Sequence, residues 1–304
     1  MRKIVVVLAP FTLVAVLTGL AAAGVTSRGP VKTTTANELS PAATAVWFAW
    51  SQTSPDHPQR ANVRAEQLPV DGTDDFRVNL PGTRAWTGGI EGGQLVYQQI
   101  ADGNSNIRLF NLASQTHAPN PEVNTQRWEW HPSITTDTSG DTWILFGRQN
   151  VSNWTQRILA FNVQDQTLRT LAETTNRRHS LIPGQVNGDW ATWTACRPDC
   201  NVRYVNLLSG GPATVPRPDF VRHQYASSIA EDGTIYFARS GRGCGANVKI
   251  VRRETGDNTV MVDLDDRRDV FFTYTSDEAA NHVYYDRVGC GSGAWNIYKF
   301  VDGP

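Results

Sequence analysis

The chain has 304 residues, enough for two ordinary domains or one large all-β domain, and 40% of them are hydrophobic. Its formal net charge of −1 excludes the strongly basic balance that is typical of proteins binding nucleic acid or anionic membrane surfaces. Ten Trp and only two Met favour strands over helices, because aromatic side chains fit the pleated surface of a sheet.

Residues 1–23 have the features of a secretory signal peptide. A basic start, MRK, precedes an apolar run over residues 4–20, and three alanines supply small residues for cleavage before Gly24. The alternative is an uncleaved anchor, but Pro10 and a run of only 17 residues favour cleavage. No cysteine follows the run, so we expect a secreted or periplasmic protein without a lipid anchor and without membrane insertion after cleavage.

Beyond residue 39 the sequence repeats with a spacing of 45–49 residues, and a second strand-like run follows each repeat start by 12–17 residues. Glycine turns such as EGGQ, TSGDT, VNGD and AEDGT precede the repeat starts, and no stretch shows a sustained helical period. Four short strands in about 45 residues are typical of a β-propeller blade. The six repeats therefore predict an all-β, six-bladed β-propeller of four-stranded antiparallel blades. The repeats start at Val46, Leu95, Trp143, Trp190, Ile235 and Val283.

The last repeat stops after its third strand, in WNIYKFVDGP, so one strand is missing from the ring. Residues 30–39 precede the first blade and are rich in β-branched side chains. We expect this segment to supply the outermost strand of the last blade, which removes an open sheet edge. The predicted organisation is a signal peptide over residues 1–23, a closing segment over residues 24–39, and one propeller domain over residues 40–304.

Two segments, TDTSGDTWILFGR and IAEDGTIYFARS, resemble the blade motif of bacterial TolB-type, WD-repeat-like propellers. The motif has a small or polar residue, then Asp-Gly or Gly-Asp, then an apolar strand. The resemblance covers most of residues 40–304. It implies a periplasmic protein-binding propeller without catalysis, although fold resemblance is a weak guide to function. TolB also carries an additional N-terminal domain, for which we expect no room here.

The cysteines are four in number, as expected for disulfides in an exported chain. A four-cysteine zinc site is the alternative, but only Cys196 and Cys200 form a close pair. Cys244 lies in SGRGCGANVKI, which fits the dinucleotide-binding pattern G-x-G-x-x-A. A strand follows this segment where that pattern needs a helix, so we interpret it as a hairpin tip. Cys290 lies in the matching tip one blade later, and we predict the disulfides Cys196–Cys200 and Cys244–Cys290.

Three histidines recur in successive blades where the innermost strand is predicted to begin, and arginines cluster beside them. Innermost strands line the channel of a propeller, so these residues predict a ligand or partner site at one channel mouth. Three histidines can also form an open zinc site, and the alternative is an ordinary polar surface neutralised by acids such as Glu129. The predicted binding residues are Arg84, Trp130, His131, Arg178, His179, Arg222 and His223.

Catalytic signatures such as G-x-S-x-G, H-E-x-x-H and the P-loop are missing from the sequence. We therefore expect a monomeric, non-catalytic binding or scaffold propeller without cofactor or metal. Its partner would be an unknown protein or an anionic or carbohydrate ligand, and not nucleic acid. Contacts would come from the channel mouth and from the loops joining the second and third strands. The alternatives are a propeller enzyme of glycosidase or lactonase type, and a lectin suggested by the tryptophan content.

Overall fold

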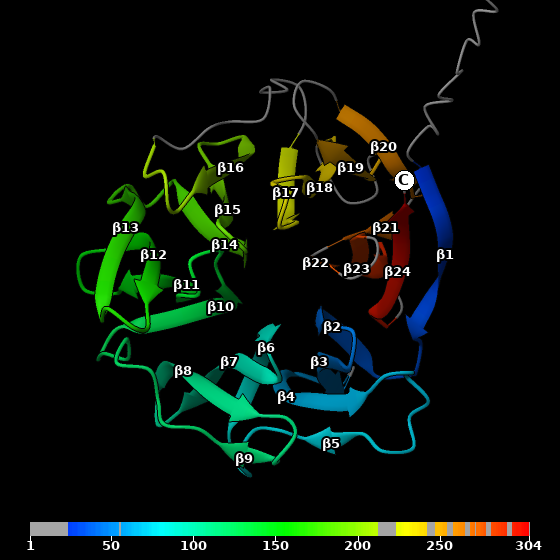
Figure 1. Ribbon diagram of the computed structural model, residues 1–304, viewed down its shortest axis with the longest axis horizontal. Coiled ribbons are helices and arrows are strands. Elements are labelled where there is room, and N and C mark those ends of the chain that lie inside the picture. Colours follow the sequence, from blue (N-terminus) through cyan, green and yellow to red (C-terminus); the bar gives the residue numbers. More distant parts are fainter. Residues whose placement is uncertain are drawn as a thin grey trace, which may run out of the picture.

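The computed structural model describes residues 24–54, 56–211, 223–241, 247–253, 258–264, 268–270, 272–277, 281–290 and 294–303. Six antiparallel sheets are arranged around one axis, and the strands nearest the centre are β2, β6, β10, β14, β17 and β22 (Figure 1). The chain is thus a six-bladed β-propeller, as the repeat predicts. No helix in the described part of the chain has the length and apolar character needed to cross a bilayer.

The blades follow one another in chain order. In blades 1–5 consecutive strands run from the axis outward, whereas in blade 6 both β21 and β22 pair with β23. Blade 1 contains β2 (Asn37–Ala43), β3 (Trp47–Ser54), β4 (His57–Gln67) and β5 (Phe76–Arg77). Blade 2 contains β6 (Arg84–Glu91), β7 (Gln94–Ala101), β8 (Asn104–Asn111) and β9 (Thr116–His117). Blade 3 contains β10 (Trp128–Thr136), β11 (Thr142–Asn150), β12 (Thr155–Asn162) and β13 (Thr167–Thr174).

The later blades repeat the pattern. Blade 4 has three strands within the described residues, β14 (Ser180–Asn187), β15 (Trp190–Cys196) and β16 (Cys200–Asn206). Blade 5 contains β17 (His223–Ile229), β18 (Ile235–Ser240), β19 (Lys249–Arg253) and β20 (Asn258–Asp263). Blade 6 contains β21 (Arg268–Asp269), β22 (Thr273–Asp277), β23 (Asn281–Gly289) and β24 (Asn296–Gly303).

The N-terminal strand β1 (Gly24–Lys32) completes blade 6. It pairs antiparallel with β24, from Gly24 opposite Gly303 to Lys32 opposite Ile297 (Figure 1). The propeller is therefore closed by an N-terminal strand, as the sequence predicts. The position predicted for the closing strand, residues 30–39, is wrong, however. Within the closing segment it is Gly24–Lys32 that pairs with β24, whereas Asn37–Ala43 is the innermost strand of blade 1.

The link between β1 and β2 explains this difference in boundaries. The hydroxyl of Thr34 accepts a hydrogen bond from the backbone N–H of Ala36 and donates one to the carboxylate of Glu38. Threonine side chains that bond to nearby groups in this way favour turns, despite the high strand propensity of threonine. The threonine run at residues 33–35 therefore ends one strand instead of forming its centre.

The core lies between neighbouring blades, because both faces of the middle strands are covered. At the contact of blades 1 and 6, the ring of Phe48 stacks on Trp50 at 5.5 Å and lies 5.6 Å from Tyr284. All three side chains are fully or almost fully buried. Burial of each such ring contributes roughly 2–3 kcal/mol, which explains why the strands are continuous apolar runs instead of alternating ones.

A β-bulge interrupts each of the first five innermost strands at its middle, where the pairing register with the second strand shifts. Glycines occupy this point in β6 and β14, at Gly88 and Gly184. In β2, β10 and β17 the bulge contains Ser40, His131 and Ala226, each with a positive φ of 44–50°. Positive φ is unusual for residues other than glycine, and histidine is among those that tolerate it best. The bulge of blade 3 thus carries an imidazole where the other four carry small residues.

The predicted disulfide Cys196–Cys200 is present and closes the tip of the β15–β16 hairpin. Cys290 is also disulfide-bonded, whereas its predicted partner Cys244 lies outside the described residues. The predicted signal peptide over residues 1–23 and the predicted site residue Arg222 lie outside them as well.

Candidate functional site

A mostly apolar cavity of about 70 Å³, the His131 cavity, lies near the axis, where the innermost strands of blades 3, 4 and 5 have their bulges. Its walls come from β10, β14, β15, β17 and the residue that precedes β22. The lining residues are His131, Ile182, Pro183, Thr194, Tyr225, Ala226, Ser227 and Phe272. A concave, mostly apolar site with a few polar groups is the usual form of a small-ligand site.

The imidazole of His131 is the most distinctive group in this cavity. Its ring meets Phe272 edge-on, with the ring centres 5.8 Å apart. The Nδ1 atom is buried, and no described residue offers it a hydrogen-bond partner. Because burial disfavours the charged form, the pKa of His131 is lowered to about 4, and the ring is neutral at pH 7.

Three further polar side chains line the same cavity, those of Thr194, Tyr225 and Ser227. The hydroxyl of Ser227 is buried and, within the described part of the chain, has no hydrogen-bond partner. The hydroxyl of Tyr225, in contrast, donates a hydrogen bond to Oδ1 of Asp269 at 2.7 Å. Burial is the main cause of a raised pKa for Tyr225, so this phenol stays neutral and fixed in place. Two polar atoms in the wall of this cavity, Nδ1 of His131 and Oγ of Ser227, therefore have no hydrogen-bond partner among the described residues.

The close packing of blades 4 and 5 depends on Gly184. A Cβ atom at this position would lie 2.5 Å from the hydroxyls of both Ser227 and Thr192, and 2.6 Å from the Ser227 carbonyl oxygen. Contacts below 3.0 Å force a neighbour to move. Gly184 therefore allows β14 to approach β17 closely enough to form this wall of the cavity.

The other predicted histidines lie in separate environments. His223 is the first residue of β17, and its Nδ1 accepts a hydrogen bond of 3.2 Å from the backbone N–H of Cys200. His179 directly precedes β14, and its backbone N–H bonds to the carbonyl of Asn176 at 2.9 Å. His131, as described above, lies on the bulge of β10. The three histidines thus differ in position and contacts, although the sequence pattern places them alike.

Arg84, Arg178 and Trp130 lie outside the cavity wall. Arg84 is the exposed first residue of β6, and Arg178 is exposed in the link before β14. The ring of Trp130 packs over Gly147, where a Cβ atom would lie 2.4 Å from Trp130 Cε2. Among the described residues the structure thus brings His131 alone, of the predicted set, into the cavity.

Metal binding finds no support in the parts of the chain that the structure describes. No three side chains of His, Cys, Asp or Glu in these parts come close enough together to hold a metal ion. The alternative of a three-histidine zinc site therefore has no geometric basis within the described residues.

Carbohydrate stacking requires exposed aromatic rings, and several strand tryptophans do not provide them. The side chains of Trp50, Trp143 and Trp193 are 0%, 9% and 2% exposed. These three residues belong to the packing between blades and offer no ring face to a carbohydrate.

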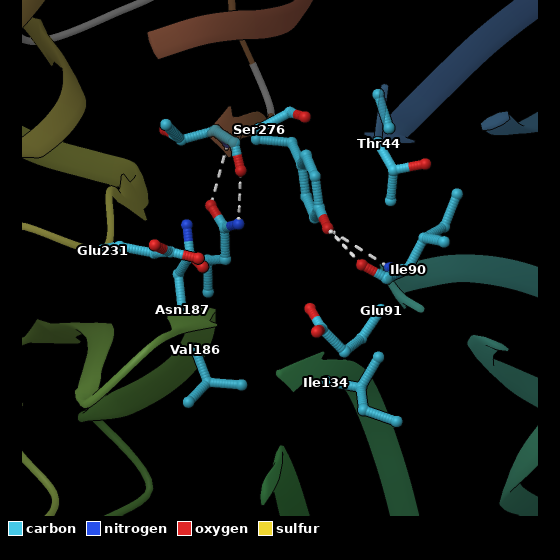
Figure 2. A pocket seen from close by; sticks show the side chains of 12 residues that line it. Thr44, Ile90, Glu91, Ile134, Val186, Asn187, Glu231 and Ser276 are labelled. Atoms are coloured by element: carbon cyan, nitrogen blue, oxygen red, sulfur yellow. Dashed lines mark hydrogen bonds between the residues drawn. The ribbon is translucent and has the colours of Figure 1, made fainter. Parts of the chain in front are cut away.

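A second cavity of about 70 Å³, the acidic cavity, lies where the innermost strands end (Figure 2). Glu91 and Glu231 line it, and the pKa of Glu91 is raised by burial and by the nearby charge of Glu231. Gln185 crosses toward β22, where its amide donates to the Thr275 carbonyl at 2.7 Å and accepts from the Thr275 N–H at 2.9 Å.

Sequence reasoning missed this acidic end of the molecule. A signal for it was present, because Glu91 and Glu231 occupy the same place in two repeated turns, EGGQ and EDGT. Only the ring arrangement shows that equivalent turns of different blades face one another near the axis (Figure 2).

No family model and no curated protein sequence matches the chain. Solved structures share its fold at low sequence identity. TolB from Acinetobacter baumannii is 14% identical with a TM-score of 0.56, over 84% of this chain and 63% of TolB. A protein of unknown function from Dyadobacter fermentans is 9% identical with a TM-score of 0.64, over 93% of this chain and 99% of that protein.

An oligogalacturonate lyase in complex with manganese is 9% identical with a TM-score of 0.52, over 93% of this chain and 94% of the lyase. The chain thus has a TolB-like six-bladed propeller fold and spans less than two thirds of the length of TolB. Because a lyase shares this fold with TolB, the fold alone leaves the function open.

Proposed function

We propose that this chain is an exported, non-catalytic binding propeller that takes an apolar group of a ligand into the His131 cavity. The observation that carries the proposal is a pair of buried polar atoms in an apolar wall, Nδ1 of His131 and Oγ of Ser227, which have no hydrogen-bond partner among the described residues. Buried polar groups without partners are rare in native proteins, and each calls for an explanation. A ligand that forms hydrogen bonds with both atoms would explain why they are unpaired among the described residues.

The chemistry of the wall defines the ligand group. Leaving one buried polar atom without a partner costs about 1–3 kcal/mol, which a ligand regains when it bonds to that atom. The ring of Phe272 and the side chain of Ile182 favour an apolar body. The group that fits is therefore small and apolar, with one hydroxyl or amide, as in a short side chain of a peptide or the end of a small molecule.

Arginines at the same end of the propeller extend the proposed site. Arg84 and Arg178 are exposed near the starts of the innermost strands β6 and β14. Guanidinium groups form paired hydrogen bonds with carboxylates, so they would favour a ligand that carries negative charge outside the cavity. Arg222, outside the described residues, belongs to the same proposed rim together with Trp130, His179 and His223.

Export is part of the proposal. The disulfide Cys196–Cys200 suits an oxidising compartment, such as the periplasm or the medium. The sequence of residues 1–23 favours secretion for the same chain. We infer that the mature protein works there as a monomer.

A hydrolase is the second candidate function, because a serine hydroxyl and a histidine imidazole line one cavity. Nucleophilic catalysis needs these two groups within hydrogen-bond reach of each other. No hydrogen bond joins Ser227 to His131, and each is unpartnered among the described residues. Binding without catalysis is therefore the better-supported function.

The proposal is tested with phenol and isobutanol as probes, by following the NMR signals of the His131 ring and the Ile182 methyl groups. We expect saturable shifts of these signals in the wild type. Ser227→Ala and His131→Asn should bind the probes several-fold more weakly. The exposed histidine variant His57→Asn is the matched control and should bind like the wild type. Non-saturating shifts, or equal binding by both cavity variants, would overturn the proposal.

The same variants separate binding from hydrolysis. Hydrolysis of chromogenic esters and aminoacyl amides is measured with wild type and with Ser227→Ala. A binding protein shows no turnover that depends on Ser227. A loss of about 10³-fold or more in turnover on removal of this hydroxyl would instead establish the hydrolase.

A further inference from the structure

Three arginines surround a small hollow at the edge of blade 3, here named the arginine pocket. Its volume is about 30 Å³, and it lies at the tip of the β11–β12 hairpin beside the start of β10. Across the hairpin, Arg148 lies directly opposite Arg157. The lining residues are Arg127, Arg148, Asn150, Asn153, Thr155 and Arg157.

The two carboxylates nearby balance only part of this positive charge. Nε of Arg148 donates to Oε1 of buried Glu129 at 2.9 Å, and its Nη2 donates to the carbonyl of Val123. Nε of Arg157 donates to Oε2 of Glu173 at 2.6 Å. The guanidinium of Arg127 has no ion-pair partner in the described part of the chain.

Guanidinium N–H groups therefore remain available at the pocket. Each guanidinium has five N–H donors. Arg157 uses only Nε in the contacts described, which leaves both of its terminal nitrogens. Arginines held directly opposite each other repel, so this arrangement is unfavourable unless a negative group lies between them.

Asparagines add neutral donors to the same wall. Oδ1 of Asn150 accepts the backbone N–H of Ser152 at 3.1 Å, and Oδ1 of Asn153 accepts that of Thr155 at 3.2 Å. Each side-chain oxygen thus accepts a hydrogen bond within the loop, and each amide NH₂ can donate hydrogen bonds to a ligand. Among the residues that the structure describes, no carboxylate lines the pocket itself.

We propose that the arginine pocket binds an oxyanion, namely the carboxylate, sulfate or phosphate group of a ligand. Its size admits an anionic head group and not a whole ligand. Arginine is suited to this role because its planar fork matches the oxygens of carboxylates and phosphates.

Two further observations support an anion at this place. The pKa of Arg148 is lowered, first by burial and further by the charges of Arg127 and Arg157. The three cations are therefore close enough to repel one another. The guanidinium of Arg177 also lies 5.8 Å from the ring centre of Trp154, in the same hairpin loop. A fourth cation therefore adds to the positive field at this edge.

The site is separate from the His131 cavity and shares no lining residue with it. It can therefore hold an anion whether or not the cavity binds a ligand. Failure of one proposal leaves the other intact.

The experiment titrates sulfate, phosphate and acetate separately at constant ionic strength, reading the Nε–H signals of ¹⁵N-labelled arginine. We expect saturable shifts at Arg127, Arg148 and Arg157. Arg127→Gln should bind at least tenfold more weakly, and the double variant Arg127→Gln/Arg157→Gln should not saturate. Arg148 is kept, because its loss would leave buried Glu129 without its cation.

The control is Arg60→Gln, which removes one exposed positive charge from blade 1. It should bind the three probes as tightly as the wild type. Comparing the affinity for acetate with the affinities for sulfate and phosphate shows whether the pocket prefers a carboxylate or a tetrahedral anion. Linear shifts for all three probes, or equal weakening by the control, would overturn the proposal.

Discussion

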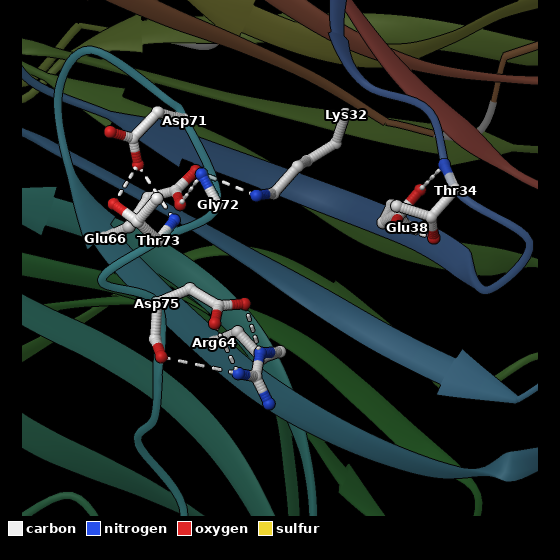
Figure 3. A network of polar contacts seen from close by, with 9 residues as sticks. All are labelled: Lys32, Thr34, Glu38, Arg64, Glu66, Asp71, Gly72, Thr73 and Asp75. Carbon is white, nitrogen blue, oxygen red and sulfur yellow. Dashed lines mark hydrogen bonds and ion pairs between the residues drawn. The ribbon is translucent and has the colours of Figure 1, made fainter.

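The ammonium Nζ of Lys32 lies 3.0 Å from Oε1 of Glu66, and this ion pair joins the closing strand to blade 1 (Figure 3). Lys32 ends β1, whose backbone pairs with β24 in blade 6, whereas Glu66 belongs to β4. The Lys32 ammonium also lies 4.5 Å from the ring centre of Trp50. The pair thus ties together the first and last blades at the seam of the ring.

Removing one partner of this pair should destabilise the whole propeller. The side chains of Lys32 and Glu66 are only 12% and 2% exposed, so Lys32→Met leaves a buried carboxylate without its cation. We expect a loss of about 3 kcal/mol in the free energy of unfolding, measured in urea. The double variant Lys32→Met/Glu66→Gln should recover part of this loss, because it also removes the negative charge of the buried Glu66 carboxylate.

The matched control is Lys249→Met, because Lys249 forms a 2.8 Å ion pair with Asp263 at the surface. Exposed pairs contribute about 1 kcal/mol or less, so this variant should stay close to the wild type. Equal losses for Lys32→Met and Lys249→Met would show that the seam pair contributes nothing beyond a surface contact.

Deletion of residues 24–33 should lower the melting temperature sharply, because it removes β1 and leaves β24 as an open edge. Open edges also promote aggregation, so the shortened chain should elute partly as multimers in size exclusion. A synthetic peptide of residues 24–33 should restore the melting temperature, whereas a scrambled peptide should not. An unchanged melt of the shortened chain would rule out a stabilising role for the closing strand.

The fold follows from the sequence because it rests on local, repeated signals. The turns EGGQ, TSGDT, VNGD and AEDGT mark the hairpin between the first and second strands of four blades. Closure was also predictable, since a ring with an incomplete last blade needs a strand from elsewhere. The position of that strand was not predictable, because the turn formed by Thr34 depends on its contact with Glu38.

The candidate site was harder to predict, because it depends on contacts between distant residues. His131 and His223 look equivalent in the sequence, yet the former lies on a bulge and the latter bonds to the Cys200 backbone. Ser227 carried no sequence signal, since its significance comes from the cavity that it shares with His131. Arg127 carries no separate signal in the sequence, because the pocket around it is formed together with residues of β11, β12 and their connecting loop.

Burial of His131 should make the stability of the protein pH-dependent. The folded-state pKa is about 4, below the value of about 6.5 for an unfolded histidine. The unfolded state therefore takes up the proton first as the pH falls. Stability is full above about pH 6.5 and is lost progressively toward pH 4, by up to about 3 kcal/mol at 1.4 kcal/mol per pKa unit.

Comparison with His131→Asn isolates this effect from the titration of other groups. Asparagine tolerates the positive φ at this position and does not titrate. The wild type should lose stability relative to the variant between pH 6.5 and pH 4, measured by urea unfolding at each pH. His57→Asn, an exposed histidine variant, should follow the wild type. Parallel curves for the wild type and His131→Asn would contradict a buried neutral imidazole.

The hairpin disulfide of blade 4 should contribute roughly 2 kcal/mol, the estimate for so short a loop. Cys196→Ala/Cys200→Ala should lose about this much stability in urea unfolding. Peptide mapping of the unreduced protein should find Cys196 linked to Cys200 and Cys244 linked to Cys290. A peptide in which Cys196 is linked to Cys244 would contradict both assignments.

Gly184→Ala should open the wall between blades 4 and 5. The new methyl group would meet the Ser227 and Thr192 hydroxyls at 2.5 Å, and a backbone carbonyl at 2.6 Å, so the strands must separate. Overpacking of this kind typically costs about 1–3 kcal/mol. Because Ser227 lines the His131 cavity, phenol binding should weaken as stability falls. Gly29→Ala in β1 is the matched control, because nothing lies within 4 Å of its Cβ position. If both glycine variants unfold at the same urea concentration, the close approach at Gly184 does not hold the cavity wall in place.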